Sequence, residues 1–211
     1  MNLINPLVPV WEAFQATEDA FKISRRVVTF ANQATDILNA LDGSELETEK
    51  AVAIAQYKTG RNFLNRIKVL NQTNTLNSLL TQSVEEINDL FVLSLWAAFE
   101  RFVRDFLQEK GKKNQEILPL ALGEVYYQQV YQEIDYWKPE SILDLLKRSL
   151  FKGDEQQIGL AKEVLKYRDW VAHGKNPNKV PSSIITPKLA YDRLYDITEV
   201  LIANVGEREL S

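Results

Sequence analysis

The single histidine of this chain, His173, lies five residues after Arg168 and four residues after Asp169. Histidine is the side chain whose ordinary pKa lies closest to neutral pH, so proton transfer by an imidazole must use this position. Arginine carries a planar, permanent charge that binds anionic phosphate oxygens. Phosphate chemistry combines such a cation with a proton-transfer group, and these three residues are therefore the candidate catalytic residues.

Positive charge is concentrated around this histidine. Residues 161–193 hold seven Lys and Arg against three acids, a net charge of +4, which leaves −8 for the rest of a chain whose total is −4. Lys166, Lys175 and Lys179 are the lysines nearest to His173, and we expect them to bind an anionic substrate. A solvated helix face followed by a lysine-rich loop would give the same pattern, so charge alone leaves both interpretations open.

Composition excludes several other classes of site. The 211 residues, 45% hydrophobic and 26% charged, are typical of one globular domain or of one domain with an appendage. The absence of cysteine excludes disulfides, thiolate metal sites and cysteine nucleophiles. One histidine excludes a histidine metal cluster within a chain, although a carboxylate-bound magnesium stays open. We expect no cofactor, and no signal peptide or membrane span, hence a cytoplasmic protein without a membrane partner.

Apolar residues recur at helical spacing along nearly the whole chain, and strand patterns are scarce. The spacing predicts helices over residues 11–41, 44–70, 76–110, 117–135, 140–151, 155–173 and 188–203. Ser44 and Glu47 form a capping box that opens the second helix, so the first two helices are expected to form an antiparallel hairpin. We predict an all-α helical bundle, residues 73–211, with the N-terminal hairpin, residues 1–72, packed on it or continuous with it.

Residues that favour helix ends mark several boundaries. Gly111, followed by two lysines, is expected to end the third helix, while Pro139 and Pro187 fit first-turn positions. Asp154 with Gln157 resembles a capping pair. Gly174 is placed to adopt the left-handed conformation that follows a helix, immediately after His173.

Two charged residues fall in apolar faces when the helices are drawn at 100° per residue. Arg168 lies in the middle of the apolar stripe of its helix, and Glu100 in the middle of a second apolar stripe on the 76–110 helix. A charge that faces a core must be paired, so the two residues are expected to be partners. Asp169 and His173 are four residues apart on the stripe's edge, which predicts a hydrogen bond that orients the imidazole.

Five aromatic residues occur close together in the predicted 117–135 helix and just after it: Tyr126, Tyr127, Tyr131, Tyr136 and Trp137. Such rings could stack on nucleic-acid bases. Aromatic residues at helical spacing more often belong to a core, and we favour that interpretation.

The constellation resembles the HEPN superfamily. Arg168-Asp169-x-x-x-His173, at the end of a late helix in an all-α chain, matches the R-x4-H signature of that family, including the polar residue after the arginine. The segment Leu95-Trp96-Ala97-Ala98-Phe99-Glu100-Arg101-Phe102 resembles the earlier helix of the RiboL-PSP-like branch, where an aromatic residue precedes a glutamate. Together the resemblance covers about residues 75–205, and the N-terminal hairpin is compatible with it.

The resemblance implies a metal-independent endoribonuclease whose active site lies where two protomers meet. Arg168 would stabilise phosphate charge, His173 would transfer protons, Asp169 would position His173, and Glu100 would orient Arg168. RNA and a second copy of the chain are the implied partners. Many members are toxins or phage-defence effectors, so an antitoxin or defence protein is a further implied partner. One subgroup carries a modified tyrosine two residues after the histidine; Lys175 stands there in this chain.

Two other classes of function stay open. The chain could be a non-catalytic HEPN-like module that binds nucleotide, RNA or a protein. It could also be a structural helical protein, in which Arg168 and Glu100 form a core ion pair and His173 merely ends a helix. Loss of His173 discriminates between these classes, because a nuclease requires it and a binding module tolerates its removal.

Overall fold

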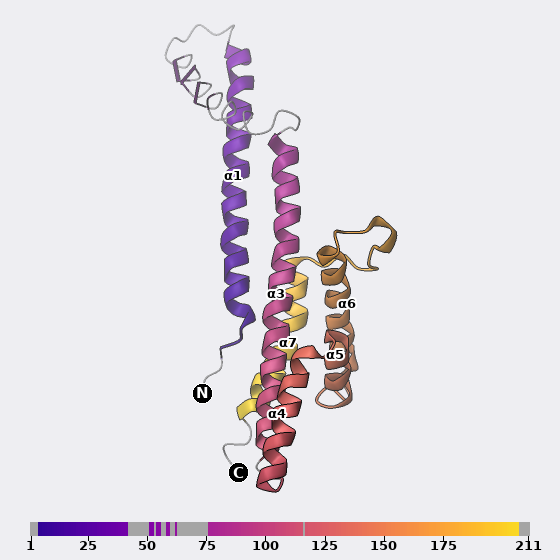
Figure 1. The fold of residues 1–211 in the computed structure, drawn as a ribbon. Coiled ribbons are helices and arrows are strands. Elements are labelled where there is room, and N and C mark those ends of the chain that lie inside the picture. The colour runs from indigo at the N-terminus through magenta and orange to yellow at the C-terminus, as the bar shows by residue number, and fades with distance from the viewer. Residues whose placement is uncertain are drawn as a thin grey trace. The chain divides into compact units, whose positions relative to one another are not determined.

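The computed structural model describes residues 4–41, 51–52, 54–55, 58–59, 62, 76–115 and 117–206. All the regular structure in these residues is helical (Figure 1). The elements are α1 (Leu7–Leu41), α3 (Leu76–Gln115), α4 (Leu120–Tyr136), α5 (Pro139–Arg148), α6 (Glu155–Ala172), the 3-10 helix η1 (Pro177–Lys179) and α7 (Pro187–Gly206). The prediction of an all-α helical bundle is confirmed.

The chain divides into two compact units. The first, which we call the bundle unit, joins Met1–Phe14 to Asn88–Ser211, and the second is Gln15–Ile87. The division falls inside α1 and α3, and the first two turns of α1 belong to the bundle unit. Trp11, for example, stacks on Tyr191 of α7 with ring centroids 4.8 Å apart.

The second unit contains most of the expected N-terminal hairpin. Within it, α1 carries the buried Val28 and an exposed charged surface in which Lys22 bonds to Glu18 and Asp19. The predicted 44–70 helix and its capping box lie almost wholly outside the described residues. The few described residues there, at 51–52, 54–55, 58–59 and 62, are helical.

Helix α6 packs against both α5 and α7 in the bundle unit. Its buried residues Ile158, Ala161, Val164 and Leu165 recur at helical spacing, so one face of α6 contributes to the core. Residues on the opposite face, such as Lys166, are exposed to solvent. The larger buried side chains opposite it come from four helices: Leu7, Leu95, Trp96, Phe99, Leu143, Leu146, Leu194, Ile197 and Leu201. This core holds the C-terminal end of α6, which carries His173.

Several helix ends lie where the sequence predicts them. Pro139 and Pro187 are the first residues of α5 and α7. The Asp154 carboxylate accepts a hydrogen bond from the Gln157 amide at 2.7 Å. Gly174 follows α6 with a positive φ of 78°, the left-handed conformation that glycine adopts without steric cost.

Three helices are longer than expected, and α7 among them continues to Gly206 instead of residue 203. Helix α1 begins at Leu7 and not at residue 11, because the Asn5 carboxamide oxygen accepts the Leu7 N–H at 3.0 Å and so caps the helix. Helix α3 continues through Gly111 to Gln115, so the predicted end at Gly111 is wrong. Gly111 lies against Tyr127 and Val130 of α4, and the lysines that follow it stabilise the negative end of the helix dipole.

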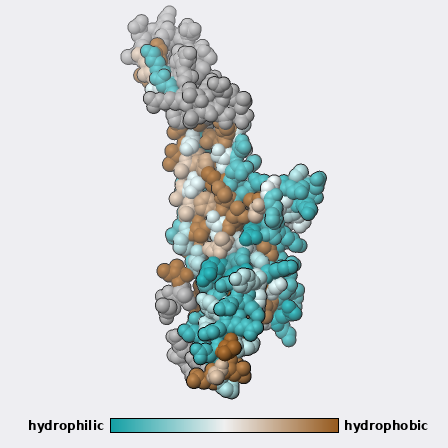
Figure 2. Space-filling model, in the orientation of Figure 1, coloured by the Kyte–Doolittle hydropathy of each residue, from teal (hydrophilic) through white to brown (hydrophobic). Residues whose placement is uncertain are grey.

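The aromatic run belongs to the core only in part, which corrects the expectation. Trp137 packs against the core and Tyr127 is half-buried, but the other three rings are exposed. Tyr126 and Tyr131 are exposed, and Tyr136 is 88% exposed. Aliphatic side chains of the same helix, Leu120, Leu122 and Val125, are exposed as well, and hydrophobic atoms gather at the lower end of Figure 2, where Figure 1 places α4. The buried residues of α4 are Gly123 and Ile134, and a side chain at Gly123 would collide with the Gln115 carbonyl oxygen, only 2.5 Å away. A narrow stripe of α4 therefore packs closely, and Tyr126, Tyr131 and Tyr136 outside it face solvent.

Candidate functional site

His173 ends α6 in a well-defined helix stop. The Gly174 N–H donates to the Val171 carbonyl at 3.0 Å, and the Lys175 N–H donates to the Trp170 carbonyl at 2.9 Å. This pair of bonds is the Schellman motif, which satisfies the last carbonyls of a helix. It turns the chain sharply and leaves the His173 side chain exposed at the start of the loop to α7. The loop is hydrophilic, at the right in Figures 1 and 2.

A buried carboxylate on α3 fixes this turn. Asp89 is 5% exposed, accepts the Tyr167 hydroxyl at 2.7 Å and forms an ion pair with Lys175. Burial, and then the hydrogen bond to Asp89, raise the pKa of the Tyr167 phenol well above its usual range. Lys175, expected to bind substrate, thus pairs with Asp89 and ties the turn to α3.

Sequence reasoning missed Asp89, although a signal was present. Asp89 precedes Glu100 by eleven residues, about three helical turns, so both carboxylates share one side of α3. The helical wheel that identifies Glu100 as a charge in an apolar stripe identifies Asp89 as well when it is extended by two residues. Tyr167, the partner of Asp89, carries no comparable signal because a buried tyrosine on a helix is ordinary.

An open pocket of about 430 Å³ lies beside His173. Its lining brings together four of the residues that the sequence predicts, and adds three more from α6 and the following loop: Lys166, Asp169, His173 and Lys179, with Trp170, Asn176 and Pro181. Lys166, His173 and Lys179 are exposed. Arg168 and Lys175 are not part of this lining, so the structure separates the predicted site residues into two groups.

The two lysines of the pocket differ from several other lysines of the bundle unit. Lys162, Lys175 and Lys188 each form an ion pair with a carboxylate. Neither Lys166 nor Lys179 does so within the part of the chain that the structure describes. Their charges are therefore available to an anion that enters the pocket, beside an imidazole able to transfer a proton.

Arg168 is held between two carboxylates. Its Nη1 donates to Asp169 Oδ1 at 2.8 Å, and its Nη2 lies 3.9 Å from Glu100 Oε2. The Arg168 side chain is 33% exposed, so it is not the buried charge that the helical wheel predicts. Among the described residues, the Asp169 side chain bonds to Arg168 and not to His173. The long Arg168 side chain reaches the Asp169 carboxylate. The group expected to orient the imidazole of His173 is therefore paired with Arg168 instead.

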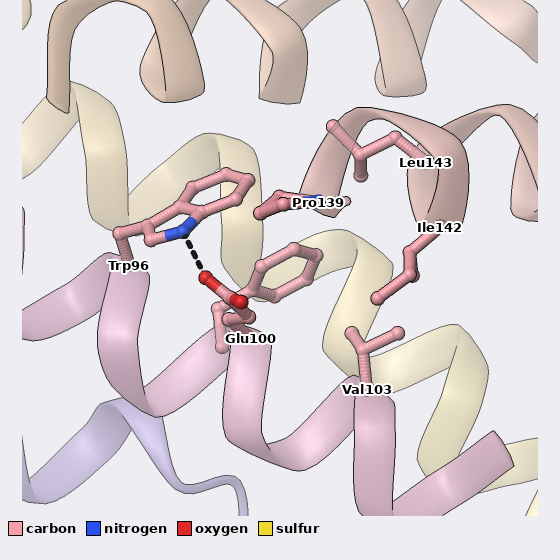
Figure 3. Close-up of a pocket in the computed structure, with 7 residues that line it drawn as sticks. Trp96, Glu100, Val103, Pro139, Ile142 and Leu143 are labelled. Carbon is pink, nitrogen blue, oxygen red and sulfur yellow. Dashed lines mark hydrogen bonds between the residues drawn. The ribbon is translucent and has the colours of Figure 1, made fainter. Parts of the chain in front are cut away.

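Glu100 has a closer partner than Arg168. Its Oε1 accepts Arg104 Nη2 at 2.6 Å, and its Oε2 accepts the Trp96 indole N–H at 2.7 Å (Figure 3). Arg104 also donates to the Trp137 carbonyl at 2.9 Å and to the Ile134 carbonyl. The expected core ion pair of the bundle is therefore formed mainly by Glu100 and Arg104.

The surroundings of Glu100 in Figure 3 are apolar. Pro139, Ile142 and Leu143 of α5 face Trp96 and Glu100 across a space of about 10 Å³, which has no room for a ligand. Glu100 thus belongs to the packing between α3 and α5. Its role toward the site is limited to the 3.9 Å approach to Arg168.

Two properties of the described residues bear on partners. No group of three or more His, Cys, Asp or Glu side chains among them is arranged to hold a metal ion. None of the helices in these residues is long and apolar enough to cross a membrane.

The chain was compared with family models, with curated proteins and with solved structures. No family model, no curated protein and no solved structure matches it. Its likeness to the HEPN superfamily therefore rests on the residues quoted above and on the all-α fold that carries them.

Proposed function

We propose that the protein is a metal-independent endoribonuclease that cleaves RNA at the pocket beside His173. The observation that carries the proposal is the juxtaposition in that pocket of the chain's one imidazole with Lys166 and Lys179. An RNA strand supplies both groups that such a pocket requires, an anionic phosphodiester and a hydroxyl that loses a proton. The resemblance of Arg168 and His173 to the R-x4-H signature supports the same reaction.

The proposed reaction begins at the ribose. His173 removes the proton of the 2′-hydroxyl, whose oxygen forms a bond to the adjacent phosphorus while the bond from phosphorus to the 5′-oxygen breaks. The leaving 5′-oxygen takes up a proton, and the products carry a 2′,3′-cyclic phosphate and a 5′-hydroxyl. Lys166 and Lys179 neutralise the negative charge that the phosphate gains in the transition state.

One chain supplies one histidine, whereas the reaction needs a base and an acid. We propose that a two-fold homodimer places a second His173 and a second Arg168 at a shared cleft, as in the family that the chain resembles. The partial exposure of Arg168 leaves its guanidinium accessible to such a cleft. Sedimentation that shows only monomers at working concentration would remove this part of the proposal.

One observation favours a second candidate, a non-catalytic module that binds RNA or nucleotide. Asp169, the group expected to orient His173, is bonded to Arg168. A binding module would use the pocket lysines and leave the imidazole without a chemical role. A toxin or phage-defence role belongs to the first candidate only, and with it an antitoxin or defence partner.

The test is the rate of RNA cleavage by His173→Ala. Because His173 is exposed, the substitution should change the free energy of unfolding by no more than about 1 kcal/mol. Cleavage should fall about 10²- to 10⁴-fold, the usual loss when acid–base catalysis is removed. The wild-type reaction should persist in excess chelator and leave 2′,3′-cyclic phosphate or 3′-phosphate ends.

Lys152→Ala is the matched control, since Lys152 is exposed in the turn after α5 and does not line the pocket. It should cleave at the wild-type rate. RNA binding without cleavage by the wild type, and unchanged binding by His173→Ala, would select the binding module. Full cleavage by His173→Ala would contradict the catalytic role of His173. Cleavage that stops on chelation, or that leaves 3′-hydroxyl ends, would contradict the proposed reaction.

A further inference from the structure

Trp170 lines the same pocket, yet the proposed cleavage reaction does not use it. The residue lies on α6 between the catalytic candidates Asp169 and His173 in the pocket lining, and it is half-buried. The indole contacts an open pocket that also presents Lys166 and Lys179, which form no ion pair with any described residue. Covering the apolar surface of the ring is favourable. The ring is therefore expected to contact an uncharged, apolar part of a ligand, whereas the lysines bind its anionic part.

The indole is held in place from two sides. Its N–H donates to the Asn176 carbonyl at 2.9 Å, and its ring lies against Tyr167 with centroids 5.7 Å apart and an interplanar angle of 50°. Tyr167 is itself fixed by the bond to buried Asp89. Because the N–H is already used, the ring offers the pocket apolar aromatic surface and no hydrogen bond.

We propose that Trp170 is a stacking platform for one unpaired base of a single-stranded nucleic acid, with Lys166 and Lys179 binding the phosphates beside that base. This inference rests on the proposed function and names its substrate class, RNA that is single-stranded at the site of cleavage. Stacking on an aromatic side chain requires a base that has left its duplex, so paired RNA is excluded from the pocket. The volume of about 430 Å³ lies in the range of small-molecule sites, enough for a base.

The experiment measures binding without cleavage. A short thymidine DNA oligonucleotide lacks the 2′-hydroxyl and cannot react by the proposed route, but it keeps bases and phosphates. Its dissociation constant is compared with that of an abasic DNA strand of the same length. Stacking contributes about 1–3 kcal/mol per base, so wild type should prefer the base-bearing strand by about 5- to 150-fold.

Two variants at position 170 separate stacking from scaffolding. Trp170→Phe and Trp170→Leu both lose the hydrogen bond to Asn176, but only the phenylalanine keeps an aromatic ring. Trp170→Phe should keep most of the preference for bases. Trp170→Leu should bind both strands alike, at the wild-type affinity for the abasic strand. A structural role for the indole would affect both variants equally and would leave the preference unchanged.

Tyr136→Leu is the control for aromatic surface elsewhere, because Tyr136 is highly exposed on α4. It should behave as wild type. The inference is overturned if wild type binds neither strand, if it does not distinguish them, or if Trp170→Leu retains the preference. It is also overturned if Tyr136→Leu loses the preference instead, since the stacking surface would then lie on α4. A thymidine mononucleotide that competes as well as the strand would show a nucleotide site and not a strand site.

These outcomes are separable from those of the cleavage test. Preference for base-bearing DNA that depends on Trp170, combined with no RNA cleavage, would overturn the nuclease and keep the single-strand site. Cleavage that depends on His173, combined with no preference for bases, would keep the nuclease and overturn the stacking platform.

Discussion

The charged residues of the bundle unit fall into two regions that differ in how completely they are paired. On α3, Glu100 accepts hydrogen bonds from Trp96 and Arg104, and Asp89 accepts one from Tyr167 and pairs with Lys175. In the pocket at the end of α6, Lys166 and Lys179 form no ion pair within the described residues. The pocket charges are thus available to a ligand.

The difference follows from solvation. A carboxylate removed from water is stable only when its lone pairs meet donors, so the α3 acids must be paired for the chain to fold. An exposed ammonium or imidazole keeps its water and needs no partner. Pairing of a buried charge therefore indicates a role in stability, whereas an exposed cluster without ion pairs can bind a ligand at no cost to the fold. Arg168 lies between the two regions, one-third exposed and in contact with both Asp169 and Glu100.

The largest expected effect on stability comes from Arg104→Met. The Arg104 side chain is 11% exposed. Its loss leaves Glu100 with the Trp96 N–H and the more distant Arg168, and removes a donor from two backbone carbonyls. Unfolding by urea should show a loss of about 3 kcal/mol, the lower end of the cost of breaking a buried ion pair. Arg168→Ala should lose no more than about 1 kcal/mol of stability, because the ion pair between Arg168 and Asp169 is partly exposed. RNA cleavage by this variant should nevertheless fall.

Arg101→Ala is the control on the same helix. Arg101 pairs with Asp105 on the exposed side of α3, so the substitution should change stability by less than about 0.5 kcal/mol. Equal losses of unfolding free energy in Arg104→Met and Arg168→Ala would contradict the distinction between a buried, fully paired region and an exposed one.

A smaller effect is expected from Tyr167→Phe. At neutral pH the variant should lose about 1–2 kcal/mol of stability, because a hydrogen bond to a buried carboxylate disappears. The raised pKa of Tyr167 adds a pH dependence. Above about pH 10 the unfolded chain releases the phenol proton while the folded chain retains it, so wild-type stability falls as pH rises.

The variant lacks this proton, so the stability gap between wild type and Tyr167→Phe should narrow between pH 9 and about pH 11. Urea unfolding at several pH values measures it. A gap that stays constant across this window would show that burial and Asp89 do not hold the phenol in its neutral form.

The smallest expected effect is a gain. Gly159 lies in the interior of α6, and an added side-chain carbon would meet no atom within 4 Å. Gly159→Ala should therefore stabilise the protein by about 0.5–1 kcal/mol through helix propensity. Cleavage and RNA affinity should stay at wild-type values, since residue 159 is more than a full turn from the pocket lining. A stabilised variant with altered RNA affinity would show that helix stability and the pocket are coupled.

Local signals in the sequence were sufficient for most helices. Apolar spacing identified α5, α6 and α7, and Pro139, Pro187 and Gly174 marked ends that the structure confirms. The same reasoning failed where a second segment decides the outcome. Helix α3 passes Gly111 because α4 packs beside it, and three of the α4 tyrosines are exposed because only a narrow stripe of that helix contacts α3.

The residue types and their spacing alone determined that proton transfer by an imidazole must use His173, and that positive charge surrounds it. They also placed Lys166, Asp169 and His173 within two turns at one helix end, since helix geometry is local. Only the tertiary structure decided which carboxylate pairs with which cation. Glu100 forms an ion pair with Arg104, Lys175 with Asp89, and Asp169 with Arg168. Each long side chain has several possible partners, and the packing of the helices determines which of them lies within reach. Periodicity can place a charge on a face of its helix, but the partner across that face is fixed by packing.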